Sequence, residues 1–294
     1  MDTTPRLDSN QLQSFAADEW WEAIRTLDDV DLESLCPLDN GRHVVRPRES
    51  LGQLDKLPIE IIIPMLLSLD IHSLIAFRRV NSRAMDLVNS LHEYQMISKH
   101  CINILRAIIC LGATWFNWRV LYETLSTTKC EMCPRYGSYL YLITCERVCY
   151  LCFTSNVRYL PLSEKNAISY IGSEVGRIPH VLNLWRWDDG VPYARERWVL
   201  LFDRQSISDS LSTLRRSTSR ERLWESEHVP NYGLIGVNRY MTIISAPYFI
   251  PSSQSAHRGF YCTRCTDETS TGMYPGTKYT EDEFPNHIRM HGLI

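Results

Sequence analysis

The chain has 294 residues, of which 44 % are hydrophobic, and it carries a formal net charge of −3 at neutral pH. A chain of this length and composition buries one large core or two smaller ones, which excludes a disordered polymer. The slightly negative charge gives no overall attraction to nucleic acid or acidic lipid, which disfavours a dedicated DNA-binding protein.

The sequence also indicates a compartment. Residues 1–20 lack the basic and apolar regions of a signal peptide, and the longest apolar run, from Ile102 to Ala113, is too short to span a bilayer. We therefore expect a soluble chain in the cytoplasm, the nucleus or both, with no membrane contact. Ten cysteines in a reducing compartment favour metal binding over disulfides.

Residues 1–48 are expected to form an acidic N-terminal arm. An amphipathic helix is predicted from Gln11 to Leu27, and it contains the adjacent residues Trp20 and Trp21. These tryptophans either insert into a partner or belong to a solvated helix that folds back on the body of the protein. The second interpretation is favoured, because acidic segments usually form solvated faces.

Short helices joined by polar turns are predicted in residues 49–95. Pro58 suits the first position of the first helix. Asp70 or Ser73 can cap the second helix. Asn81 or Ser82 can cap the third. By itself this pattern predicts a small helical bundle.

In order and spacing, the same segment resembles an F-box. The motifs are Leu-Pro-x-Glu-Ile, Leu-Asp-x-x-x-Leu and Phe-Arg-Arg-Val-Asn-Ser-Arg, which begin at Leu57, Leu69 and Phe77. The resemblance implies that the chain docks on a Skp-family adaptor and through it on a cullin ubiquitin ligase, while the remainder selects an unidentified protein substrate. Carried over by position, the resemblance implies that the adaptor-facing apolar surface consists of Leu57, Pro58, Ile61 and Leu66. It implies that two further residues lie partly in the core, Leu74 and Val80.

One residue departs from this pattern. Pro64 falls inside the first predicted helix, where a proline removes a backbone hydrogen bond and costs roughly 3 kcal/mol. The first helix is therefore expected to be short or kinked, or the docking to be weakened.

Residues 96–128 are expected to form a helical connector that is rich in aromatic side chains. Trp115, Phe116, Trp118 and Tyr122 can form either a ligand-binding aromatic box or part of the core. Aromatic residues at helical spacing are usually core, so this interpretation is favoured.

Two C-x2-C pairs in residues 129–155 predict a metal site. Cys130 and Cys133 form the first pair, and Cys149 and Cys152 form the second after fifteen intervening residues. This spacing is typical of four thiolates around one tetrahedral Zn²⁺, with a strand between two knuckles as in a zinc ribbon. Buried free cysteines and two disulfides are the alternatives. Cys145 can replace Cys149 in a looser C-x3-C pattern, but a small packed residue is the favoured interpretation.

With the cysteine pairs following the F-box and the aromatic helix, the chain resembles a large group of fungal F-box proteins that carry a zinc cluster after the F-box. The motifs are C-E-x-C, Gly-Ser-Tyr-Leu-Tyr-Leu and Arg-Val-Cys-Tyr-x-Cys-Phe. The resemblance covers residues 50–155 and, more weakly, the tail, and it implies a structural role for the metal.

Residues 156–232 are predicted to form a mixed, irregular substrate-receptor region with short helices and no large parallel sheet. Its Arg-rich segment, 195–222, can be a patch that binds phosphate groups of a phosphorylated substrate or of nucleic acid, or it can be a solvated helix face. Carboxylates among the arginines favour the solvated face. The arginines are Arg195, Arg197, Arg204, Arg215, Arg216, Arg220 and Arg222.

A second metal site is predicted in residues 233–294. Cys262 and Cys265 form a C-x2-C pair, and His287 and His291 follow after twenty-one residues with the four-residue spacing that places both rings on one helix face. Phe284 is expected to pack beneath this site. Unligated residues, and one shared site that draws ligands from both clusters, are the alternatives.

The predicted fold class is mainly α with small zinc-stabilised β-hairpin modules: a helical F-box followed by an irregular α+β region with two structural Zn²⁺ ions. A zinc ion with four protein ligands has no open position for substrate, and the sequence lacks the usual nucleotide-binding and hydrolase motifs. We therefore expect a non-catalytic ubiquitin-ligase adaptor. The alternatives are a zinc-dependent nucleic-acid-binding regulator that uses residues 195–222, and a metallohydrolase.

Overall fold

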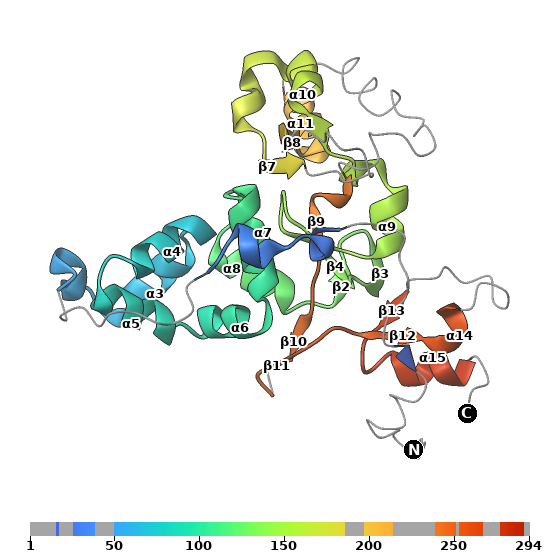
Figure 1. Ribbon diagram of the computed structural model, residues 1–294, viewed down its shortest axis with the longest axis horizontal. Coiled ribbons are helices and arrows are strands. Elements are labelled where there is room, and N and C mark those ends of the chain that lie inside the picture. Colours follow the sequence, from blue (N-terminus) through green and yellow to red (C-terminus); the bar gives the residue numbers. More distant parts are fainter. Residues whose placement is uncertain are drawn as a thin grey trace.

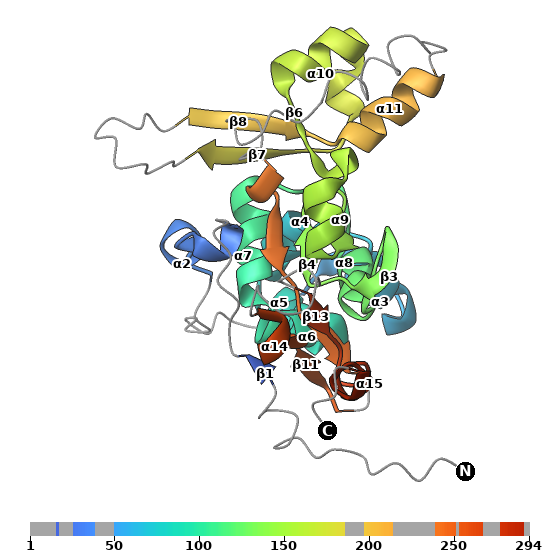
Figure 2. The same ribbon diagram turned by 90° about the vertical axis from the view of Figure 1, so that its right-hand side faces the viewer.

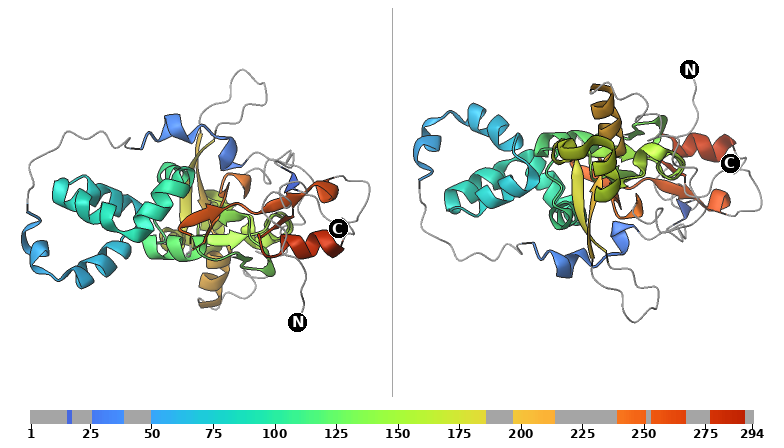
Figure 3. Two further views of the ribbon diagram at one scale, coloured as in Figure 1. Left: turned by 90° about the horizontal axis from the view of Figure 1, so that it is seen from below. Right: turned by 90° about the horizontal axis from the view of Figure 1, so that it is seen from above.

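The computed structural model describes residues 16–17, 26–38, 50–185, 197–213, 239–250, 253–266 and 277–290. Within these ranges the chain is mainly helical, with small antiparallel sheets. Figure 1 shows a helical end, a lobe and a C-terminal part, all joined to a central body; the described residues of these parts are 50–90, 160–185 with 197–213, and 248–250 with 253–266 and 277–290. The helical end and the C-terminal part lie at opposite ends of the molecule (Figure 3).

Three short helices form the helical end: α3 (Ile59–Leu67), α4 (Ile71–Arg78) and α5 (Ser82–Ser90). They follow the 3-10 helix η2 (Gly52–Lys56). The predicted caps of α4 and α5 are confirmed, because the side chains of Asp70 and Asn81 accept hydrogen bonds from the backbone N–H groups of Ser73 and Ala84. Pro58 is the N-cap of α3, one position before its predicted place.

Pro64 lies inside α3 and cannot donate a hydrogen bond to the carbonyl of Glu60. The helix nevertheless continues for one more turn, because the backbone N–H of Ser68 donates to the carbonyl of Pro64 at 3.1 Å. With nine residues, α3 is as long as α5 and α6, so Pro64 does not shorten it relative to the neighbouring helices.

The helices α6 (His92–His100), α7 (Ile102–Leu111) and α8 (Trp118–Leu125) form the connector. Trp118 is fully buried, which confirms the core interpretation of that aromatic residue, whereas Trp115 is 38 % exposed. The backbone N–H of Trp118 donates to the carbonyl of Leu69, so α8 is joined directly to the helical end. One continuous core extends from α3 through α7 to the cysteine-bearing strands.

A three-stranded antiparallel sheet in the order β5–β4–β9 lies at the centre of the body. Its strands are β4 (Tyr139–Tyr141), β5 (Glu146–Val148) and β9 (Ile243–Ser245). Tyr139 pairs with Val148 on one side and with Ser245 on the other. The chain therefore leaves the central sheet after β5 and returns about a hundred residues later, so the segments predicted as 129–155 and 233–294 share one sheet.

The segment between β5 and β9 contains a lobe with its own small core. Strands β6 (Leu162–Ser163), β7 (His180–Trp185) and β8 (Arg197–Phe202) form an antiparallel sheet in the order β6–β8–β7. It is covered by α10 (Glu164–Ile171) and α11 (Arg204–Thr213), and Figure 2 shows the long β7–β8 hairpin extending beside them. The 3-10 helices η3 (Val157–Tyr159) and η4 (Gly172–Arg177) connect these elements.

The C-terminal part consists of a hairpin, a second small sheet and two helices. The hairpin is formed by β10 (Tyr248–Ile250) and β11 (Ser255–His257). The sheet has the order β1–β12–β13, with β1 (Ala16–Ala17), β12 (Phe260–Cys262) and β13 (Lys278–Tyr279). The helices are α14 (Thr263–Thr266) and α15 (Phe284–Met290).

The predicted helix from Gln11 to Leu27 is wrong at the positions that the structure describes. Ala16 and Ala17 form β1 and pair with Cys262 and Tyr261, because β12 offers a free edge for backbone hydrogen bonding. Leu27 begins the 3-10 helix η1 (Leu27–Asp29). Trp20 and Trp21 lie outside the described residues.

Residues 26–38 pack on the body, whereas the two interpretations of Trp20 and Trp21 concern residues outside the described ranges. Residues 26–38 contain η1 and α2 (Leu32–Leu35). Leu27 and Leu32 are buried in the main core, and the carboxylate of Asp28 accepts a hydrogen bond from the backbone N–H of Ser245 at the end of β9. In the part of the chain covered by the structure, no helix combines the length and apolar character needed to cross a membrane.

A buried arginine joins the segments of the body. Arg147 on β5 donates to the carbonyls of Thr124 and Leu125 at the end of α8, and to those of Ala246 and Pro247 after β9. It also donates to the carbonyl of Gly137 at 2.6 Å. A side chain at position 137 would overlap with Arg147, so this contact requires the glycine.

Candidate metal centres

The first cysteine pair lies on a short hairpin. Strands β2 (Lys129–Cys130) and β3 (Cys133–Tyr136) are antiparallel, and Cys130 is directly paired with Cys133. The backbone N–H of Met132 donates to the Sγ atom of Cys130 at 3.4 Å. The tight turn therefore aims both thiols to the same side, as a metal knuckle requires.

The second pair lies at the start of a helix, which differs from the predicted ribbon. Cys149 is the N-cap of α9 (Tyr150–Ser155), and its Sγ atom accepts a hydrogen bond from the backbone N–H of Cys152 at 3.4 Å. A helix N-terminus also favours negative charge because of the helix dipole.

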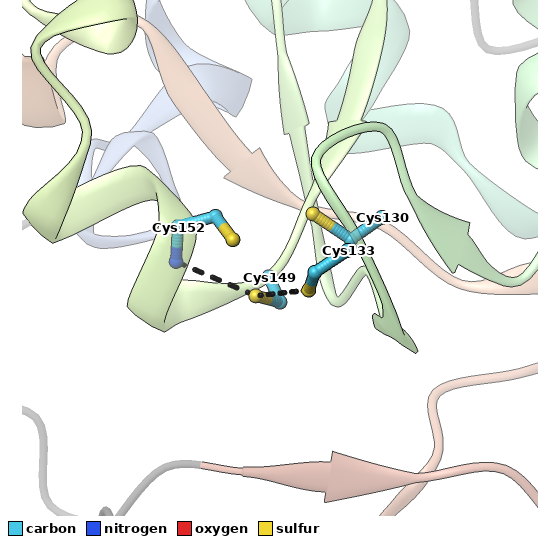
Figure 4. A group of neighbouring side chains, drawn as sticks. All are labelled: Cys130, Cys133, Cys149 and Cys152. Carbon is cyan, nitrogen blue, oxygen red and sulfur yellow. Dashed lines mark hydrogen bonds between the residues drawn. The ribbon is translucent and has the colours of Figure 1, made fainter.

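All four sulfur atoms converge on one point between the hairpin and the helix (Figure 4). They lie within 4.8 Å of one another, and the Sγ atoms of Cys133 and Cys149 are 3.7 Å apart. A disulfide would bring two sulfurs to about 2.05 Å, and all four cysteines are free thiols. The four cysteines can therefore hold one metal ion, as the sequence predicts.

The thiols of this cluster shift in opposite directions, and the hydrogen bond with Cys130 raises the pKa of Cys149 well above its usual range. The pKa of the Cys130 thiol is lowered, chiefly by the hydrogen bond with the thiol of Cys149. Burial raises the pKa of Cys152 to about 12, so this thiol is protonated at neutral pH in the absence of a metal ion. Metal binding therefore has to release protons, and the affinity is expected to rise with pH.

Cys145 does not join the cluster. It lies in the turn between β4 and β5 with a φ of 60°, and its thiol faces the hydroxyl of Thr124 at 3.9 Å. Burial raises its pKa to about 12, because the loss of water outweighs the opposing effects of the Thr124 hydroxyl and the Arg147 guanidinium. It is a small packed residue, so the looser C-x3-C alternative is not supported.

The second cluster is held by the C-terminal sheet and α15. Cys262 ends β12, Cys265 lies on α14, and His287 lies on α15. Their ligand atoms lie within 4.8 Å of one another, and the Cys265 Sγ atom is 3.4 Å from the His287 Nε2 atom. All three side chains are buried. His291, the predicted fourth ligand, lies outside the described residues.

Aromatic side chains support this cluster. The ring of Tyr279 stacks on that of His287 with centroids 4.0 Å apart, which fixes the orientation of the imidazole. Phe284 is fully buried with Cys262 and Cys265 and stacks on Phe260, so the prediction that it packs beneath the site is confirmed. The two clusters form separate groups, so a single shared site is not supported.

Replacing Cys265 with serine is expected to remove one of two metal ions, because the hydroxyl is a poor substitute for a thiolate ligand. Native mass spectrometry of the intact chain measures this ratio. Cys145→Ser, which changes a cysteine outside both clusters, is the matched control and should keep the full metal content. Unchanged metal content in Cys265→Ser would contradict the second site.

The predicted adaptor-facing residues divide into two sets. Leu57, Pro58 and Ile61 are exposed at the surface of the helical end, with Ile61 at 51 %. Leu66 is buried at 4 %, which corrects its placement on the surface, and Leu74 is fully buried, as its core assignment predicts.

Val80 also differs from the prediction. It lies in the turn between α4 and α5 and is 58 % exposed, because the chain ends α4 before the apolar stripe reaches this position. Sequence reasoning missed two exposed residues of α3, Ile59 and Met65, at 42 % and 46 %. For Met65 the sequence does contain a signal: it follows Ile61 by four residues, which places Ile61 and Met65 on one face of the helix.

The Arg-rich segment is described only in part. Arg204 is fully buried in α11 and donates to the carbonyl of Leu160 at 2.9 Å, so it cannot belong to a surface that binds phosphate groups. Arg197 lies on β8. The remaining arginines of this segment lie outside the described residues: Arg195, Arg215, Arg216, Arg220 and Arg222.

Comparison of the chain with models of known families, with curated proteins and with solved structures finds no match.

Proposed function

We propose that the chain is a non-catalytic substrate-receptor subunit of a Skp–cullin–F-box ubiquitin ligase. The observation that carries the proposal is the group of exposed apolar side chains at the helical end, which we call the exposed apolar face although only Ile61 and Met65 share one side of α3. Five large hydrophobic side chains are at least 39 % exposed there: Leu57, Ile59, Ile61, Met65 and Val80. Single exposed apolar residues are ordinary, whereas a group of them indicates a site of association.

The arrangement of α3 supports a docking role for this face. Ile62 and Leu66 are four residues apart and are buried in the main core, while Ile61 and Met65 have the same spacing and are exposed. The helix is therefore apolar on two faces. The face with Ile62 and Leu66 packs in the protein's own core. The face with Ile61 and Met65 is expected to be covered by the Skp-family adaptor.

The four-cysteine cluster supports a structural role for the rest of the chain. Four thiolates around a tetrahedral zinc ion with bonds of about 2.3 Å lie roughly 3.8 Å apart, which agrees with the 3.7 Å between the Cys133 and Cys149 sulfurs. Such a quartet leaves no position for a substrate or a reactive water. We infer that zinc stabilises the body that presents a protein target, and that partners transfer ubiquitin.

Replacing Ile61 with aspartate is expected to weaken binding to a purified Skp-family adaptor by at least about 100-fold, or roughly 3 kcal/mol, because docking would bury an unpaired carboxylate. Isothermal titration calorimetry measures the affinity. Ile61 is half exposed in the free chain, so the substitution leaves its folding intact.

Val120→Asp is the matched control. Val120 is 36 % exposed on α8, outside the apolar face, and this variant should bind the adaptor like the unaltered chain. Equal affinity of the Ile61→Asp and Val120→Asp variants would contradict the proposed docking surface.

A further inference from the structure

Two cysteines outside both metal clusters lie against each other on the surface of the body. Cys36 is the C-cap of α2, and Cys110 lies on α7. Both are free thiols and both are only partly buried, so a small oxidant can reach them. Figure 2 shows α2 beside α7.

The packing of α2 on α7 sets this juxtaposition independently of the thiols. Leu32 of α2 is buried in the main core together with Ile108 and Leu111 of α7. One contact between the helices is the ion pair between Glu33 and Arg106 at 3.2 Å.

The sequence spacing places both thiols near this contact. Cys36 follows Glu33 by three residues, and Cys110 follows Arg106 by four, so each cysteine lies about one helical turn from the ion pair. Burial and, after it, the neighbouring thiol of Cys36 raise the pKa of Cys110 to about 11.

We propose that Cys36 and Cys110 form a redox-modification site, at which hydrogen peroxide converts the two thiols into a disulfide. The sulfur of Cys36 attacks the peroxide oxygen, which gives a sulfenic acid and one molecule of water. The sulfur of Cys110 then attacks the sulfenic sulfur and expels hydroxide, which takes up the Cys110 proton to form a second water. Two electrons pass from the thiols to the peroxide, and a dithiol reductant reverses the reaction.

The disulfide would have a defined structural effect. It would fix residues 26–38 to α7 and close a loop that contains α6 and the whole helical end, α3, α4 and α5. The inference rests on the α2–α7 contact alone and does not depend on the proposed function, so a failure of adaptor binding leaves it unaffected.

Peptide mapping under non-reducing conditions tests the proposal on the metal-loaded full-length chain. Trypsin releases Cys36 in the peptide 26–42 and Cys110 in the peptide 107–119, each with a single cysteine. After treatment with hydrogen peroxide, we expect a species in which these two peptides are joined and two hydrogen atoms are lost. Dithiothreitol should remove it, and the Cys36→Ser variant should not form it.

Cys101 supplies a matched control within the same chain. It lies at the start of α7 and is buried, and trypsin releases it in the peptide 100–106. Because proximity determines which thiols react, the 26–42/107–119 species should exceed any 26–42/100–106 species by at least about tenfold. Equal amounts of the two species, or oxidation of Cys36 beyond sulfenic acid with Cys110 still alkylatable, would overturn the proposal.

Discussion

Replacing Cys149 with serine is expected to unfold the central body of the protein. Cys149 supplies one of four ligands in the first cluster and also caps α9. Structural zinc contributes roughly 10–16 kcal/mol of binding free energy in zinc-finger peptides near neutral pH, which equals or exceeds the whole stability of an ordinary domain.

The loss of structure in the Cys149→Ser variant should differ between parts of the chain. The cysteine cluster and the helical end belong to one core, but α3, α4 and α5 lie at the far end of it from the cluster (Figure 1). We therefore expect loss of near-ultraviolet circular dichroism and of one metal ion, with much of the helical signal retained. Cys145→Ser makes the same chemical change four residues away and should keep the metal. A Cys149→Ser variant with a full metal content and an unaltered melting temperature would contradict the structural role of this centre.

Replacing Arg147 with methionine is expected to lower the free energy of unfolding by at least about 3 kcal/mol, because each buried carbonyl that loses its partner costs about 1–3 kcal/mol. Five carbonyls from three segments of the chain accept from this one guanidinium. Its exposed fraction is 2 %, so water cannot replace the lost donors. Urea denaturation followed by tryptophan fluorescence measures the change.

Arg158→Met is the comparison for this effect. Arg158 forms an ion pair with Glu146 at 2.8 Å, but its side chain is 25 % exposed, so water and ions can replace the interaction. We expect a loss of about 1 kcal/mol for this variant. Equal stability losses in the two variants would show that Arg147 does not hold the segments together as the structure indicates.

The local features of the fold are those that the sequence predicts well. The caps at Asp70 and Asn81, the convergence of the first cysteine quartet and the packing of Phe284 all depend on residues within a short stretch or on a motif with one physical purpose. Each can be inferred from spacing because a helix cap or a metal ligand set has few alternative geometries.

The long-range pairings are the features that the sequence does not reveal. β4 pairs with β9 across about a hundred residues, and Ala16 pairs with Cys262 at the edge of the second cluster. Backbone hydrogen bonds specify neither partner, since the side chains of such short strands carry little pattern. The position of Cys149 at a helix start could not be predicted from the sequence, because a C-x2-C pair fits both a hairpin turn and a helix N-terminus.

The two apolar faces of α3 could be predicted in part from the sequence. Ile61, Ile62, Met65 and Leu66 are all apolar, so composition does not separate the core face from the exposed one. Only the contact with α4 and the rest of the core decides that Ile62 and Leu66 are buried. The misplacement of Leu66 follows from this ambiguity, and the four-residue steps show which residues share a face without showing which face is covered.

Amide hydrogen exchange of the chain with and without a Skp-family adaptor tests the central claim most directly, because it locates the adaptor on the surface. The account predicts that exchange slows on adaptor binding in residues 57–66 and around Val80, and that the lobe of β7, β8 and α10 is unaffected. Protection confined to that lobe, or no protection in α3 at adaptor concentrations that saturate binding, would contradict the docking of this chain through its exposed apolar face.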